Sequence, residues 1–318
     1  MRGFIRPCII FGYILFSLPS LSSGGTLFQE TFDDANFASR GWYDGGLLLS
    51  NTEHLNGSIS SAEFFFKQGG TKPTSGGAVR KKFLETDALY VSYYVKYSAD
   101  WEGANLPVGP HEFLILTNLN GDWDAPAYSH LTAYIEQNEG TPLLSIQDGQ
   151  NIDEARVGQD LTSITEQRAV AGCNGDSDGY GDGSCYPVVA AQGMVHRNGK
   201  SWKAGAVYFQ DTPGPSYKSG WHFIEAYFKL NSVVNGKGVA DGAIQYWFDG
   251  VLIIDRNNVM IRTGQHPNMK FNQFMIAPYM GDGSPIDQTF WVDNLTVATS
   301  RGTTGAAPPS PPKNLRVK

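Results

Sequence analysis

The 318-residue sequence has little cysteine, little charge and no long apolar segment. It contains three cysteines and no C-x-x-C pair, which argues against a thiol redox motif and against the close cysteine pairs of a zinc site. Only 17% of its residues are charged, whereas a typical globular chain has about 25%. Its 24 Lys and Arg residues form no cluster and face 31 acidic residues, which argues against a nucleic-acid partner and against docking on anionic lipid.

The amino terminus carries the pattern of a secretory signal peptide. Arg2 and Arg6 flank an apolar run from Cys8 to Leu18, and small residues follow. The run is shorter than the ~20 residues that span a bilayer, although a single membrane anchor is the alternative. We expect residues 1–22 to be removed, which shifts the formal charge from −7 to −9 because two arginines and no acid are lost. The mature protein is then secreted, extracellular or periplasmic, with no membrane contact.

The remaining chain has the composition of a large all-β domain. It is rich in glycine, with 37 residues, and in aromatics, at 13%. We expect one domain over residues 23–300, followed by a Pro-rich linker or disordered tail at 301–318, RGTTGAAPPSPPKNLRVK.

Period-two alternation of apolar and polar residues predicts strands at 89–98, 130–136, 142–148, 221–230, 243–249 and 290–297. Asp249-Gly250 before the apolar VLII predicts a hairpin. No window has a long 3.6-residue period, although residues 151–170 could hold one short helix. Many strands separated by turns predict a two-sheet sandwich, and the absence of alternating βα units argues against a nucleotide-binding fold.

Three segments resemble a known superfamily. Residues 236–264, GKGVADGAIQYWFDGVLIIDRNNVMIRTG, are similar to the paired late strands of concanavalin A-like jelly rolls, as found in polysaccharide lyases of that type. LFQETFDD near the start and FWVDNLTV near the end are similar to the terminal strand pair of such domains. The resemblance implies an all-β, concanavalin A-like jelly-roll sandwich of two antiparallel sheets. Because the same fold serves lectins, hydrolases and lyases, it does not decide the activity.

The segment CNGDSDGYGDGSC at 173–185 has the spacing of a calcium loop. Counted from Asn174, oxygen ligands fall at positions 1, 3 and 5, glycine at 6, a carbonyl at 7 and an acid at 9. Position 12, where a glutamate would complete the shell, is Cys185. We expect a disulfide between Cys173 and Cys185 and a structural Ca²⁺ held by Asn174, Asp176, Asp178, Tyr180 and Asp182. A stapled polar loop without metal is the alternative.

The polar faces of the predicted strands are rich in aromatic and hydrogen-bonding side chains. This mixture suits a sugar chain, whose C–H faces lie on rings while its hydroxyls meet polar groups. An ordinary solvent-facing surface is the alternative. The expected substrate-binding residues are Tyr90, Tyr94, Lys96, Glu136, Glu225, Tyr227, Gln245 and Trp247.

The resemblance to lyases implies a catalytic set drawn from His, Tyr, Gln or Asn, and Arg or Lys. A uronate lyase must neutralise the carboxylate, remove the C5 proton and protonate the leaving oxygen. Arg262 begins the segment 262–285, in which polar residues lie between apolar positions. Its guanidinium could pair with a uronate carboxylate or form a structural salt bridge. The candidates are His111, His130, Tyr134, Gln147, Lys229 and Arg262.

These observations favour a monomeric, secreted lyase that cleaves an acidic, uronate-containing polysaccharide by β-elimination. The main alternative is a non-catalytic carbohydrate-binding or adhesion module. A third is a glycoside hydrolase, which would need two carboxylates about 5 Å apart if it retains configuration. The usual E-x-D-x-x-E strand is absent; Glu136 and Glu225 could meet across strands, but the sequence does not place them.

Overall fold

The computed structural model describes residues 25–74, 79–105, 111–117, 131–152, 182–190, 193–259, 261–262 and 267–302. Within these ranges the chain is built from strands, and its one helical element is the short 3-10 turn η1 (Phe37–Arg40). The all-β prediction is therefore confirmed. No helix of the described part is long and apolar enough to cross a membrane.

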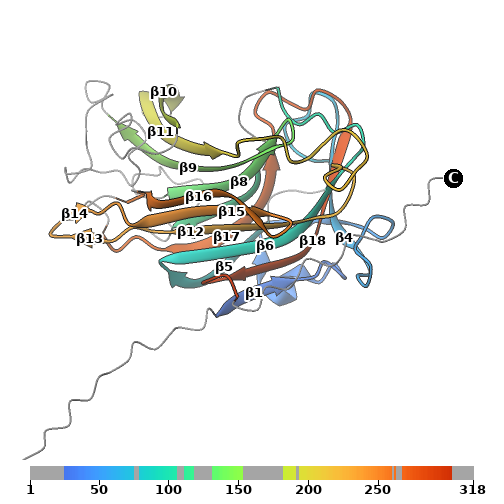
Figure 1. Cartoon of the computed structure of the whole chain (residues 1–318), viewed down its shortest axis with the longest axis horizontal. Coiled ribbons are helices and arrows are strands. Elements are labelled where there is room, and N and C mark those ends of the chain that lie inside the picture. The colour runs from blue at the N-terminus through green and yellow to red at the C-terminus, as the bar shows by residue number, and fades with distance from the viewer. Residues whose placement is uncertain are drawn as a thin grey trace, which may run out of the picture.

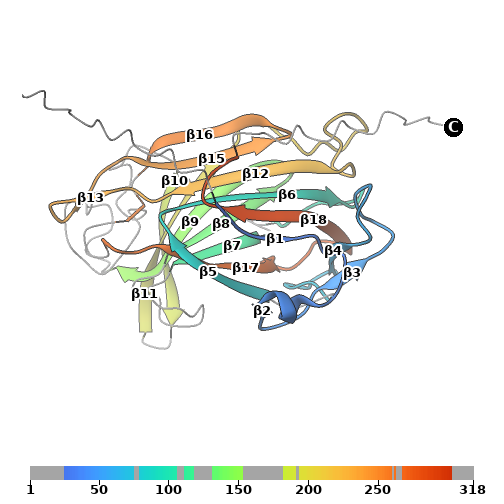
Figure 2. The ribbon, with the colours of Figure 1, turned by 90° about the horizontal axis from the view of Figure 1, so that it is seen from below.

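The first large sheet, sheet A, has eight strands and is antiparallel throughout. Its long central strands lie side by side in both views of the molecule (Figures 1 and 2). The spatial order is β16 (Val251–Val259), β15 (Gly242–Phe248), β12 (His222–Lys229), β6 (Ala88–Tyr97), β18 (Gln288–Ala298), β4 (Ser61–Phe66) and β3 (Leu48–Ser50), with β1 (Thr26–Glu30) paired to β18.

The second large sheet, sheet B, also has eight antiparallel strands. Its order is β10 (Asp182–Ala190), β11 (Gly193–Lys203), β9 (Thr141–Ile152), β8 (Leu131–Asn138), β7 (His111–Thr117), β17 (Phe271–Tyr279), β5 (Val79–Thr86) and β2 (Trp42–Tyr43). A separate small hairpin pairs β13 (Val233–Val234) with β14 (Lys237–Gly238).

The hydrophobic core lies between the two sheets. Tyr93 of β6 packs edge-on against Phe113 of β7, with ring centroids 4.6 Å apart, and Phe28 of β1 packs against Phe274 of β17 at 5.8 Å. All four side chains are less than a tenth exposed and belong to one continuous cluster. Burial of each such side chain stabilises the fold by about 1.5–3 kcal/mol, so alternate residues of nearly every long strand point inward.

This arrangement is a jelly-roll sandwich of two antiparallel sheets, as predicted. Each strand expected from alternation is present, and the Asp249-Gly250 turn joins β15 to β16. Most of the segment in which we allowed a short helix lies outside the described residues; its first two positions belong to β9.

Candidate functional site

The structure divides the predicted polar residues between two faces on opposite sides of the sandwich. Tyr134 and Glu136 lie on the outer face of sheet B. The remaining expected substrate-binding residues lie on the outer face of sheet A, because the core occupies the space between the sheets. We call this second group the sheet A face: Tyr90, Tyr94, Lys96, Glu225, Tyr227, Gln245 and Trp247.

Cross-strand register aligns a row of residues over sheet B. Arg80 of β5 pairs with Met275 of β17, Met275 with Leu114 of β7, Leu114 with Tyr134 of β8, and Tyr134 with Ser145 of β9. Tyr134 is 7% exposed and packs against Met275 on the side away from the main core. The row thus brings a tyrosine and an arginine onto one sheet face from strands that are far apart in sequence.

Further polar side chains surround this row. Gln273 Nε2 donates to the hydroxyl of Tyr43 at 2.7 Å, and Arg80 Nε is 3.0 Å from Asp44 Oδ2. Glu136 is 1% exposed, and its Oε2 lies 3.5 Å from the Ser145 hydroxyl. We call this group the sheet B face: Tyr43, Arg80, Tyr134, Glu136, Ser145 and Gln273.

Two more predicted catalytic positions have backbones next to this group. His111 of β7 is the register partner of Glu136, and Gln147 of β9 is the register partner of Thr132. Together with Tyr134 they occupy three neighbouring strands. His130 lies outside the described residues.

Sequence reasoning missed Arg80 and Tyr43, and it noted Gln273 only as part of a polar segment. A usable signal was present in β5, whose sequence VRKKFLET places Arg80 and Lys82 two residues apart and therefore on the same side of a strand. Arg80 is buried and Lys82 is exposed. Because Arg80 is paired with Asp44, Lys82 is the exposed cation that this strand adds to the face.

Lys229 and Arg262 do not join this group. Lys229 is an exposed residue at the end of β12 in sheet A. Arg262 is 8% exposed and donates to Met269 O at 2.6 Å and to Asp87 Oδ1 at 3.0 Å, while Lys270 reaches Asp87 Oδ2 at 2.7 Å. Partial burial alone would raise the pKa of Asp87, but the two cations outweigh it and hold that pKa below its usual value. Arg262 therefore forms the structural salt bridge that we weighed against uronate binding.

The residues of the sheet A face bond chiefly to one another and to neighbouring segments. The Arg301 guanidinium donates two hydrogen bonds to the buried Glu225 carboxylate, at 2.7 and 2.9 Å. Arg301 Cζ also lies 4.7 Å from the centroid of the Trp247 ring. Tyr90 donates to Glu225 at 2.6 Å.

The other residues of the sheet A face are also held in place. Burial, with smaller effects from nearby acids, raises the pKa of Tyr94 to about 12, so its hydroxyl stays protonated. Lys96 pairs with Glu53 at 2.5 Å and Gln245 with Asp255 at 2.8 Å.

The placement of Glu136 and Glu225 on different sheets excludes them as the carboxylate pair of a glycoside hydrolase. Glu136 belongs to the outer face of sheet B and Glu225 to the outer face of sheet A, with the core between them. Two carboxylates on opposite sides of the molecule cannot act on one glycosidic bond.

The predicted calcium loop and disulfide fall almost entirely outside the described residues. This applies to Cys173, Asn174, Asp176, Asp178 and Tyr180. Asp182 and Cys185 belong to β10, where their backbones pair with Ser201 and Asn198 of β11. The loop and the disulfide stay predictions. Within the part of the chain that the structure describes, no three His, Cys, Asp or Glu side chains are grouped to hold a metal.

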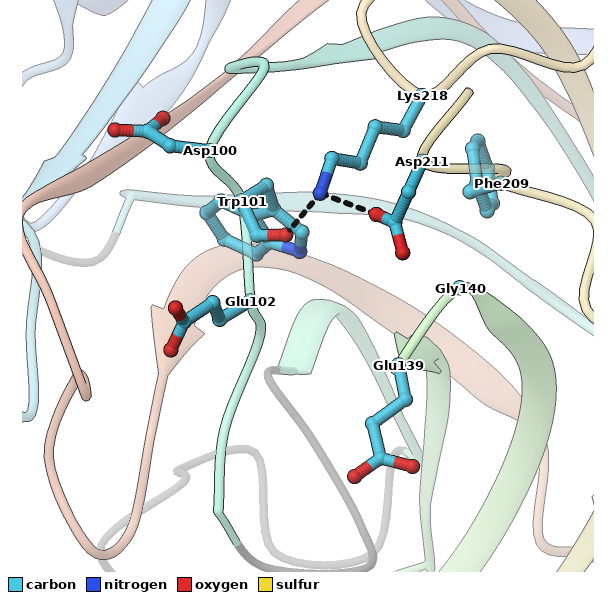
Figure 3. Close-up of a pocket in the computed structure, with 8 residues that line it drawn as sticks. All are labelled: Asp100, Trp101, Glu102, Glu139, Gly140, Phe209, Asp211 and Lys218. Atoms are coloured by element: carbon cyan, nitrogen blue, oxygen red, sulfur yellow. Dashed lines mark hydrogen bonds and ion pairs between the residues drawn. The ribbon is translucent and has the colours of Figure 1, made fainter.

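A pocket of about 460 Å³ opens between the segment after β6, the β8–β9 turn and the segment between β11 and β12 (Figure 3). Lys218 crosses it, with Nζ 2.6 Å from the carbonyl oxygen of Trp101 and 2.5 Å from Asp211 Oδ1. Three further acids line the wall, which makes it net negative and unsuited to a polyanion: Asp100, Glu102 and Glu139.

No protein-family model and no curated protein matches the sequence. Among solved structures, the chain is similar to an alginate lyase from Chlorella virus, with a TM-score of 0.51 and 14% identity over 87% of this chain and 100% of that one. It is similar to the same degree to a marine alginate lyase from Aplysia kurodai, with a TM-score of 0.51 and 12% identity over 87% and 100% of the two chains. At such identities the likeness concerns the fold. The chain therefore has the jelly-roll fold on which these two polysaccharide lyases are built.

Proposed function

We propose that the protein is a polysaccharide lyase that cleaves a uronate polymer on the sheet B face. The observation that carries this proposal is the row that places Tyr134 and Arg80 on one face of sheet B, with β7 and β17 between them, flanked by Gln273 and by the backbones of His111 and Gln147. The shared fold of the two alginate lyases supports the reaction class by analogy.

β-Elimination makes three demands that these residue types can meet. A cation or amide must hold the uronate carboxylate, which increases the acidity of the C5 proton; Arg80 and Gln273 suit this role. A base then removes that proton, the C4–C5 double bond forms, and the C4–O bond breaks. An acid protonates the departing oxygen. Tyr134 and His111 are the groups that we assign to these proton transfers.

One exposed cation lies beside the proposed site. The chain as a whole would repel a polyanion, but β5 contributes Lys82 next to the row, while the neighbouring Arg80 is paired with Asp44. An exposed cation attracts a polyanion, and added salt weakens the effect.

The proposal is tested by incubating the protein with a panel of uronate polymers and following ultraviolet absorbance of the unsaturated product. We expect Tyr134→Phe to lower kcat about 10²–10⁴-fold, because it removes a proton-transferring hydroxyl and little volume. The matched control is Tyr227→Phe on the sheet A face, which should leave kcat unchanged. Full activity of Tyr134→Phe, or no unsaturated product from any uronate polymer, would overturn the proposal.

A second candidate is non-catalytic binding of a saccharide on the sheet A face. The observation in its favour is a set of half-buried rings there, including Tyr94 packed against Phe223 in a tilted arrangement with centroids 4.9 Å apart, and Trp291 beneath Lys96. Retention on a polysaccharide gel that persists in Tyr134→Phe and is lost in Trp291→Ala, with no product formed by either protein, would favour this function.

A further inference from the structure

Unpaired negative charge surrounds the pocket at the end of β8. Its charged wall residues come from three segments that are far apart in sequence: Asp100, Glu102, Glu139, Asp211 and Lys218. The Lys218 ammonium is paired with Asp211 at 2.5 Å. Among the described residues, no Lys, Arg or His is ion-paired with the other three carboxylates, and all three are exposed. The pocket therefore presents three carboxylates that a ligand could neutralise.

Backbone hydrogen bonds fix the wall segments to one another. The Gly140 carbonyl oxygen accepts from the N–H groups of Tyr208 and Phe209, at 2.8 and 3.0 Å. The Lys218 carbonyl oxygen accepts from the Tyr97 N–H at 3.0 Å, which joins the third segment to β6. A ligand that enters a wall already held in this way loses little binding free energy to ordering it.

A buried indole N–H adds a second polar feature to the wall. Trp101 is 4% exposed, and its ring packs against that of Tyr97 with centroids 4.9 Å apart. Trp101 Nε1 has no hydrogen-bond partner among the described residues. Figure 3 shows the nitrogen side of the ring turned towards the space between Lys218 and Gly140. Because a buried donor is usually matched by an acceptor, this N–H indicates a ligand that carries an acceptor oxygen.

The geometry suits an organic ligand better than a metal ion. Within the described part of the chain, no three His, Cys, Asp or Glu side chains are grouped closely enough to hold a metal. The carboxylates are instead spread around a space of about 460 Å³, which lies in the usual size range of organic-ligand pockets. Such a ligand must offer donors to the carboxylates and an acceptor to the indole.

We propose that this pocket binds a cationic amino sugar, a saccharide unit with a free ammonium group. The ammonium group pairs with the unpaired carboxylates, and hydroxyl groups of the sugar accept from the Trp101 N–H. A neutral sugar would leave the negative charge of the wall uncompensated. A simple amine would leave the indole N–H without an acceptor.

The pocket is separate from the sheet B face and its binding is independent of the proposed lyase activity. Glu139 lies five residues beyond Tyr134 in the chain, which is about 17 Å along an extended strand. The carboxylates of the pocket would also repel a uronate. The test therefore measures binding and melting and does not depend on turnover.

The first test compares three ligands by isothermal titration calorimetry. They are the trimer of β-1,4-linked glucosamine, its fully N-acetylated counterpart, and spermidine, which has ammonium groups but no hydroxyl group. We expect the glucosamine trimer to bind at least about tenfold more tightly than either of the others, because it alone meets both demands of the wall. Added salt should weaken its binding.

The second test is Glu139→Asn, which removes one wall carboxylate without disturbing the turn. Glu139 has φ 48° and Gly140 has φ 74°, and Asn-Gly is the favoured pair for a two-residue turn of this kind. We expect an unchanged or higher Tm and about tenfold weaker binding of the glucosamine trimer. Asp241→Asn, in the turn before β15 at the far end of β12, is the charge-matched control and should bind as the wild type does.

The third test is Trp101→Phe, which keeps a ring in the wall and removes the N–H. Affinity for the glucosamine trimer should fall several-fold, whereas affinity for spermidine should not change. A purely structural role of Trp101 would lower Tm and reduce both affinities alike.

Three outcomes would overturn the assignment. Equal binding of the N-acetylated trimer would indicate a site for neutral saccharides, and equal binding of spermidine would indicate attraction by charge alone. Unchanged affinity of Glu139→Asn for the glucosamine trimer would place binding elsewhere. Should Trp101→Phe fail to fold, the ligand comparison and Glu139→Asn decide the matter.

Discussion

Glu112 is a buried carboxylate that links the two sheets of the sandwich. It projects from β7 into the core, where its carboxylate accepts bonds from the hydroxyls of Tyr93, at 2.7 Å, and Tyr97. Both tyrosines belong to β6, so the three side chains join sheet B to sheet A. Burial raises the pKa of Glu112 to about 7, although the two hydroxyls act in the opposite direction.

This raised pKa makes stability depend on pH. The folded protein holds the Glu112 proton more tightly than the unfolded chain, so this group's contribution to stability is complete below the usual value of 4.5 and is lost as pH rises through about 7. The loss amounts to about 3 kcal/mol at most. We expect Glu112→Gln to remove this component, as measured by urea unfolding of both proteins at pH 5 and pH 8. An identical change in unfolding free energy between the two pH values in both proteins would refute the explanation.

At the scale of elements, the β15–β16 hairpin depends on two residues with left-handed backbone. Asp249 has φ 48° and Gly250 has φ 80°, which is the pattern of the tight turn that matches strand twist. The Asp249 side chain also accepts from the Phe223 backbone N–H at 2.8 Å, so the turn is held onto β12.

Gly250→Ala should therefore destabilise the protein by about 1–2 kcal/mol, because a Cβ is unfavourable at this φ. Thermal or urea unfolding measures the loss. Gly205→Ala is the control, since a Cβ there meets no atom within 4 Å and φ is not in the left-handed range. Equal effects of the two substitutions would mean that the turn backbone does not limit stability.

The sequence predicts a strand that has one solvent-facing side and one buried side. It does not predict a strand that is buried on both sides or whose buried side carries a cation. β6 and β12 alternate clearly, whereas β17, FNQFMIAPY, is buried on both faces over most of its length and has no alternation to detect. In β5 the cations conceal the pattern, because Lys81 lies against the rings of Phe28 and Trp42 while Lys82 is exposed.

At the scale of the whole molecule, the sequence could indicate which residues share one side of a strand but not which sheet the strand joins. Tyr90 and Tyr134 both follow the same alternation, yet the structure places them on opposite outer faces. The candidate site was therefore half predictable. Tyr134, Glu136 and Gln147 came from strand patterns, and His111 came from the residue types that the resemblance to lyases implies. Arg80 required the register between β5 and β17, which is a long-range pairing.

The pairing of β1 with β18 also has a consequence for the order of events during synthesis. Phe28 must wait for Val297, its register partner, and β1 has no other partner strand among the described residues. At a ribosomal rate of about 5–20 residues per second, this interval is roughly 15–50 s. β18 also lies between β6 and β4, so sheet A closes only when β18, which ends at Ala298, has been made. The nascent chain thus stays incompletely folded until that point, which leaves time for a chaperone to engage it.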